Sequence, residues 1–166
     1  MSSIIDGLRF SFRKNLDYGQ RLVADLSEDQ MCQQPCPPDR QPANHPAWAL
    51  CHLNVYLPVI QGLIKGEEFE DPKPHRFGMD SRPELDRSIY PSREEIVRTF
   101  VDGHEEIDRL LAAVGPEILE QPVRLPRWQN LMPTAAHALP YLMLVHENIH
   151  LGQISAWRRI QGMASV

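Results

Sequence analysis

The chain has 166 residues, a formal net charge of −5 at pH 7 and a sequence pI near 5.8. Its hydrophobic content of 42% and charged content of 23% are ordinary for a soluble globular protein, and a chain of this length buries about 70% of its unfolded surface. The acidic balance and the lack of any Lys/Arg cluster argue against a nucleic-acid partner. We therefore expect one domain, residues 1–166, that folds around its own core.

The N-terminal segment and the cysteines bear on the cellular compartment. The start, MSSIIDGLRFSFRK, lacks an uninterrupted apolar run, and no segment reaches the roughly 18 consecutive apolar residues of a membrane span. We expect a cytoplasmic protein without a membrane partner. Cys32, Cys36 and Cys51 are odd in number and lack the two-residue spacer of redox and zinc motifs, so free thiols are expected. Cys51 is expected to be a small buried side chain rather than a ligand.

Two helical patterns occupy the first part of the chain. The first can be capped by residues 3–6 and runs to about Leu26, with Gly19 allowing a neighbouring helix to approach closely. A short turn capped by Ser27 and a Pro-rich connector over 35–42 follow. The second helix opens near Pro46, a favourable first-turn position for proline, and its apolar pattern extends to Ile64.

Two further helices complete the pattern. Residues 92–95 form a capping box for the third helix, which is expected to end at 115–116, and the fourth runs from near Thr134 to around Gly162. The long connection from Lys65 to Tyr90 lets the second and third helices run parallel. The sequence thus predicts an all-α fold: a four-helix bundle with a long crossover between the second and third helices.

Internal prolines and one irregular stretch add local expectations. Pro58 and Pro140 each remove a backbone hydrogen bond, at about 3 kcal/mol unless the helix bends, so kinks are expected. The kinks either open the bundle around a site or accommodate local packing. In the stretch 120–133, which also carries Arg124, the pair Arg127 and Trp128 either binds an anionic or planar ligand or packs on the surface.

The segment HENIHLGQ, residues 146–153, places two histidines one helical turn apart. At this spacing the side chains share a helix face and can reach one metal ion at about 2.0 to 2.1 Å per nitrogen. His146 and His150 belong to an apolar stripe and should point into the fold. Burying two imidazoles without a shared partner is costly, whereas a metal satisfies both.

A third ligand is needed, because catalytic zinc-type sites use three protein ligands and leave a position open. His52 lies near the centre of the apolar face of the second helix and is the candidate. His104 lies at the edge of an apolar stripe, which favours a half-exposed structural role. The remaining three are expected to be mostly solvated: His45, His75 and His137.

The segment WALCHLN around His52, followed about ninety residues later by HENIHLGQISAWRRIQG, resembles the DinB-like (YfiT-like) superfamily of bacterial four-helix proteins. The resemblance covers essentially the whole chain. It implies a divalent metal, nickel or zinc, bound by His52, His146 and His150. It also implies a thiol-dependent S-transferase or isomerase that uses low-molecular-weight thiols, although many members have no known activity. Expected partners are a small-molecule substrate or thiol, and a homodimer is left open.

Three neutral histidines leave a divalent metal its full charge, which lowers the pKa of bound water or holds a thiol as thiolate. Thiol transfer and metal-dependent hydrolysis both follow, and a non-catalytic metal- or ligand-binding module is the third hypothesis. HENIH also matches the HExxH zincin pattern, with Glu147 as base, but no His, Asp or Glu follows His150. We expect Gln153, on the same stripe, to hydrogen-bond the metal's water or thiol or, equally, to make an ordinary helix–helix hydrogen bond.

Overall fold

The computed structural model describes residues 4–35 and 43–166, and its regular structure is helical. The long helices are α1 (Ile4–Val23), α3 (Pro46–Lys65), α4 (Arg93–Ala112) and α6 (Glu147–Ile160). Between them lie the short α2 (Glu28–Met31), α5 (Ala135–Pro140) and three 3₁₀ turns, η1 (Arg87–Ile89), η2 (Pro116–Glu120) and η3 (Pro126–Trp128). The described residues contain no strand, only an isolated bridge between Pro122 and Thr134. The all-α prediction is confirmed.

The predicted fourth helix is one rod made of three pieces. α5 continues through a π-helical segment, η4 (Tyr141–His146), directly into α6. The π segment begins immediately after Pro140, where the proline's missing N–H interrupts the regular ladder. Pro58, by contrast, lies within an unbroken α3. The sequence predicted a kink at each proline. The structure shows a change of helix type after Pro140 and none at Pro58.

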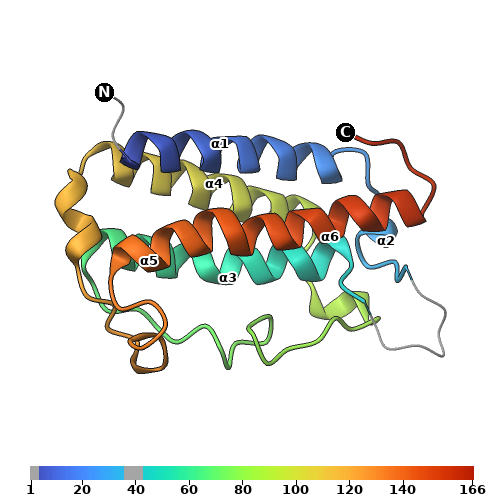
Figure 1. Cartoon of the computed structure of the whole chain (residues 1–166). Coiled ribbons are helices and arrows are strands. Elements are labelled where there is room, and N and C mark those ends of the chain that lie inside the picture. Colours follow the sequence, from blue (N-terminus) through green and yellow to red (C-terminus); the bar gives the residue numbers. More distant parts are fainter. Residues whose placement is uncertain (1–3, 36–42) are drawn as a thin grey trace.

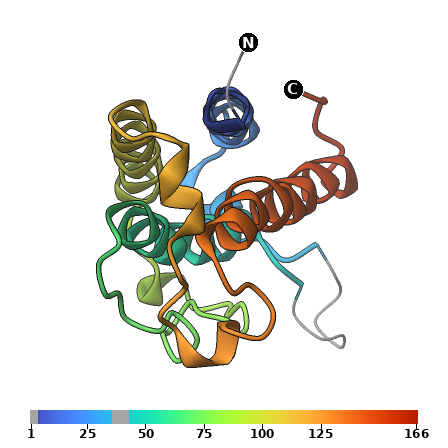
Figure 2. The ribbon, with the colours of Figure 1, turned by 60° about the vertical axis from the view of Figure 1, so that its left-hand side comes forward.

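Four rods lie alongside one another, and each packs against two neighbours (Figures 1 and 2). α3 contacts α4 and α6, and α1 contacts the same two helices. α3 and α4 run in the same direction, so the chain returns along the molecule through residues 66–92 before α4 begins (Figure 1). This return segment lies over α3 and closes one side of the site described below.

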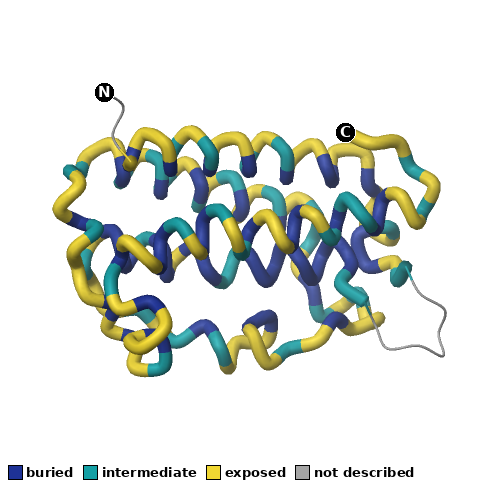
Figure 3. The backbone as a smooth tube through the Cα atoms, viewed as in Figure 1, coloured by how far each residue is buried: buried dark blue, intermediate teal, exposed yellow. Residues whose placement is uncertain are grey.

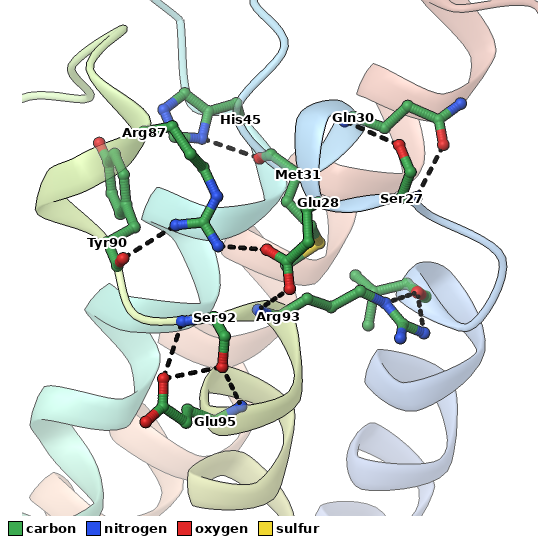
Figure 4. Close-up of polar contacts among 11 residues, drawn as sticks. Ser27, Glu28, Gln30, Met31, His45, Arg87, Tyr90, Ser92, Arg93 and Glu95 are labelled. Atoms are coloured by element: carbon green, nitrogen blue, oxygen red, sulfur yellow. Dashed lines mark hydrogen bonds and ion pairs between the residues drawn. The ribbon is translucent and has the colours of Figure 1, made fainter.

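Capping chemistry explains several helix ends. Ser27 and Ser92 each form a full capping box, with Gln30 and Glu95 respectively, as the sequence predicted for the second of these (Figure 4). Pro46 occupies the first turn of α3, as expected. The same region is tied together by Glu28, whose carboxylate accepts hydrogen bonds from the Arg93 backbone N–H and from the Arg87 guanidinium (Figure 4). Of the predicted cap at residues 3–6, Ser3 lies outside the described residues, and residues 4–6 begin α1 with Asp6 in its first turn. Most of the Pro-rich connector also lies outside the described residues.

Along the rods, buried residues lie mainly on the sides that face other rods and exposed residues lie on the outer sides (Figure 3). Gly19 permits a close approach, because a Cβ there would lie 2.7 Å from the Phe100 ring. α3 has buried residues on most of its circumference. Among the described residues it is the one helix long and apolar enough to cross a membrane, and 78% of that apolar window is buried inside the protein. Packing in the core accounts for its apolar character.

Candidate metal centre

The structure brings His52 from α3 together with His146 and His150 from the last rod. One possible ligand atom from each residue lies within 4.8 Å of the others, so the group could hold a metal ion. His52 and His150 are 4% and 8% exposed, and His146 is partly buried. These are the three histidines that the sequence singled out. His146 ends the π segment and His150 lies in the first turns of α6, so the change of helix type lies directly before the paired histidines.

Hydrogen bonds to oxygen atoms fix the tautomers of His52 and His150, and therefore which ring nitrogen of each can bind a metal. The Nδ1–H of His52 donates to the carbonyl oxygen of Phe77 at 2.6 Å, and the Nδ1–H of His150 donates to Oε1 of Gln153 at 2.9 Å. Both oxygens can only accept, so each Nδ1 carries the proton and each Nε2 keeps its lone pair. Metal-ligating histidines in proteins are commonly held by such bonds on the opposite ring nitrogen.

The spacing of the free nitrogens suits a shared cation. Nε2 of His52 and Nε2 of His146 are 3.0 Å apart. Two nitrogens bound to one metal at about 2.0 to 2.1 Å lie about 2.9 Å apart at a right angle and about 3.4 Å apart at a tetrahedral angle. Without a metal, His146 must place its proton on Nε2 and donate it to His52, because the His52 nitrogen is an acceptor. The three-nitrogen donor set therefore fits a borderline transition metal such as zinc or nickel.

Aromatic rings pack against the histidines. Trp48 stacks on His52 with ring centroids 4.8 Å apart, and Tyr56 lies 4.5 Å from His146. Burial and repulsion from the neighbouring imidazoles lower the pKa of His146 to about 3, and burial, with the nearby His52, lowers that of His150 to about 4. Burial also lowers the pKa of His52. All three rings are therefore neutral at pH 7, which is the form that binds metal.

These pKa values predict the pH dependence of metal affinity. Protons compete with metal for imidazole only below the pKa of the metal-free site, so lowered pKa values reduce competition at pH 5 to 6. Histidines with the ordinary pKa near 6.5 would instead lose metal from about pH 6 downward. We now expect affinity for Zn²⁺ to stay nearly constant from pH 7 to 5 and to fall only as pH approaches 4. Competition titrations with a chelator at each pH measure this, and a tenfold loss per pH unit beginning at 6.5 would contradict it.

The side chain of Gln153 contacts the His150 ring, whereas the sequence predicted a hydrogen bond to the metal's water or thiol, or one between helices. Its Oε1 accepts from His150 and also from Nδ2 of Asn44, at 2.7 Å, which anchors the amide to the segment preceding α3. Gln153 thus holds the His150 ring and joins α6 to the segment before α3. Asn44 was not predicted, because it is a single polar residue in an irregular segment with no periodicity to mark it.

We expect Gln153→Leu to lower metal affinity by about 10- to 100-fold, as for other residues that hold a ligating histidine. His150 would lose the acceptor that fixes its tautomer and ring orientation. Gln20→Leu, an exposed glutamine on α1, is the matched control and should bind as the wild type does. Isothermal titration with Zn²⁺ measures both. Unchanged affinity and unchanged ligand response in Gln153→Leu would show that this amide only joins two segments.

Glu147 does not face the three histidines, although it follows His146 directly. Its carboxylate is 3% exposed and accepts a hydrogen bond from Nε2 of His104 on α4 at 2.7 Å. The Nδ1 atom of His104 lies 2.7 Å from the carbonyl oxygen of Phe100. Burial raises the pKa of Glu147. Glu147 is therefore a core residue of the bundle. The HENIH segment lacks a base that faces the metal position, which a zincin needs.

Two expectations about the other histidines are wrong. His104 is structural, as expected, but is 2% exposed rather than half-exposed. His45 is fully buried rather than solvated, because it caps the N-terminus of α3. One of its ring nitrogens faces the carbonyl oxygen of Met31 (Figure 4), and the other faces that of Glu84. His75 and His137 are exposed, as expected.

The remaining candidates have structural roles. Arg127 binds Asp71 through two nitrogens and lies over the ring of the buried Trp128. The Arg127–Asp71 ion pair thus joins the segment before α5 to the segment after α3. This favours packing over a free ligand site. Cys32 and Cys51 are buried free thiols, and burial raises the pKa of Cys51 to about 12. Cys36 lies outside the described residues.

Fold and site together define an all-helical protein with a buried group of three histidines that could hold a metal ion. The sequence model of the DinB superfamily matches residues 11–154, which include all three histidines. The chain belongs to the DinB superfamily. Comparisons with curated proteins and with solved structures returned no match.

Proposed function

We propose that this protein is a four-helix bundle that binds one divalent metal, nickel or zinc, through Nε2 of His52, His146 and His150. We further propose that it acts as a thiol-dependent S-transferase or isomerase on small molecules. The observation that carries the proposal is the convergence of three neutral imidazoles, two of them with Nδ1 bound to an oxygen acceptor. A metal site is the arrangement that satisfies all three nitrogens at once.

The chain's own residues would prepare the site in three ways. Phe77 and Gln153 hold two rings in the ligating tautomer, Trp48 and Tyr56 exclude water, and burial keeps all three rings unprotonated. A divalent metal with an open position supplies one thing, a lowered pKa for a thiol or water that coordinates it. The three ligands are neutral, so they would leave the positive charge of the metal uncompensated. An anionic thiolate would offset that charge.

The orientation of Glu147 favours thiol chemistry over hydrolysis. A metal-dependent hydrolase ordinarily needs a base beside the attacking water, and the carboxylate next to the ligands is committed to His104 in the core. A thiolate needs no such base once its proton is lost, and soft thiolates suit zinc- and nickel-type ions. A metal-dependent hydrolase and a non-catalytic metal- or ligand-binding module remain the alternatives.

The test is turnover by the metal-loaded protein with a panel of bacterial low-molecular-weight thiols and an electrophile such as chlorodinitrobenzene or a bimane reagent. We expect a rate above background that needs both metal and thiol and that disappears in His146→Ala. His137→Ala, which removes an exposed histidine, should keep the full rate. Ester or amide turnover without thiol would establish the hydrolase. Tight metal and thiol binding with no product would establish the binding module.

A further inference from the structure

A cavity of about 700 Å³ lies apart from the three histidines, between α3, the first half of α4 and the segment that follows α3. None of the three histidines lines it. Its volume is within the range of about 300 to 1,000 Å³ that is typical of small-molecule sites. The apolar part of its wall comes mainly from Val55, Pro58, Val59, Phe69, Phe77 and Ile96.

One polar group in the wall is incompletely satisfied. Nδ2 of Asn54 donates to the carbonyl oxygen of Ile96 at 3.0 Å, whereas its Oδ1 is buried and has no hydrogen-bond partner. A buried acceptor without a partner costs roughly 1 to 3 kcal/mol. A bound molecule with an N–H group would provide the missing donor after a small movement of the amide.

The charge around the cavity has one dominant sign. Five carboxylates and a single ammonium group, that of Lys65, contribute to the lining. Three of the carboxylates have polar partners: Asp71 with Arg127, Glu95 with the Ser92 cap, and Glu67 with Lys65 at 3.9 Å. In the part of the chain that the structure describes, Glu68 and Glu70 form no ion pair, and both are exposed. Two exposed carboxylates without an ion pair thus belong to the lining of a largely apolar cavity.

We propose that this cavity binds a small organic cation, a protonated amine with an apolar or aromatic body. The ammonium group lies beside Glu68 and Glu70, the body packs against the apolar wall, and an N–H group reaches Asn54. Anionic compounds are excluded by like charge. The site is separate from the metal centre, so binding does not need metal or thiol. Phe77 joins the two sites, since its side chain lines the cavity and its carbonyl holds His52.

The probe is tryptamine, compared with the neutral tryptophol and the anionic indole-3-propionate, which share the indole body. Binding to the full-length, metal-free protein is followed by titration calorimetry and by the methyl resonances of Val55, Val59 and Ile96, which report the location. We expect one tryptamine per chain, shifts in these methyl signals, and at least tenfold weaker binding of tryptophol. Indole-3-propionate should not bind.

Three variants separate the contributions. Glu68→Gln with Glu70→Gln should weaken tryptamine binding at least tenfold and bring it close to tryptophol. Asp102→Asn with Glu105→Gln removes the same formal charge from the exposed face of α4 and should leave binding unchanged. Thr99→Phe, on an exposed helix position at the cavity wall, should block binding without unfolding α4. Equal binding of tryptamine and tryptophol, unweakened binding in the Glu68/Glu70 variant, or no binding of tryptamine would each overturn the proposal.

Discussion

Replacement of His104 by Ala is expected to lower the free energy of unfolding by about 3 to 5 kcal/mol, because removing one partner of a buried carboxyl group leaves that group uncompensated in the core. The variant would deprive the buried Glu147 carboxyl group of its hydrogen bond from His104. It would also remove a ring that packs between Phe12 and Phe100, each with its centroid 4.1 Å away. Urea denaturation followed by circular dichroism measures the change.

Matched variants separate the buried pair from general core packing. Glu105→Gln, at an exposed position next to His104 in sequence, should change stability by less than about 0.5 kcal/mol. Replacing both members, with His104→Leu and Glu147→Leu, should recover part of the loss because no polar group is left unsatisfied. A loss of under 1 kcal/mol in His104→Ala would contradict the account of this pair.

Replacement of His146 or His150 by Ala is expected to have the largest effect on metal binding. With two ligands left, we expect affinity to fall by more than the roughly 10- to 100-fold that loss of a supporting residue causes, so that most metal is lost on gel filtration. The helical circular-dichroism spectrum should persist, because α6 is held by buried apolar residues such as Leu151, Ile154 and Trp157. Elemental analysis of the eluted protein gives the metal content.

The exposed His137 provides the control for these variants, and His137→Ala should retain full metal content. His52→Ala tests the ligand that comes from the other helix, and it should behave as the other two do. Undiminished metal in His150→Ala would contradict the proposed centre. An unfolded His150→Ala protein would contradict the claim that the core does not depend on the ion.

The sequence was sufficient to identify the three clustered histidines because each lies on an apolar helix stripe, where periodicity reports the inward direction. The sequence pattern wrongly predicted that His45 is solvated, because a residue that precedes a proline is commonly found in a loop. In fact such a residue is placed to cap a helix, and capping buries its ring. An N-cap role for a residue before a first-turn proline is the signal that could have found it.

Other features depend on how the helices are rotated against each other, which no single helical pattern contains. The pairing of His104 with Glu147 joins α4 to α6 across the core, whereas the sequence placed His104 at the edge of an apolar stripe and offered Glu147 only as the base of a zincin pattern. The Asn44–Gln153 bond likewise joins two distant segments. Pro140 indicated a perturbed helix, but the sequence did not predict that the perturbation takes the form of the π segment η4.

The central claim is that His52, His146 and His150 bind a single divalent metal, and anomalous scattering tests it most directly. Crystals of the protein as purified would be measured on both sides of the absorption edges of nickel and zinc. The account predicts one strong anomalous peak, about 2.0 to 2.1 Å from each of the three Nε2 atoms. A peak too far from any one of these three atoms for coordination would contradict it. The absence of an anomalous peak in crystals grown with added metal would also contradict it.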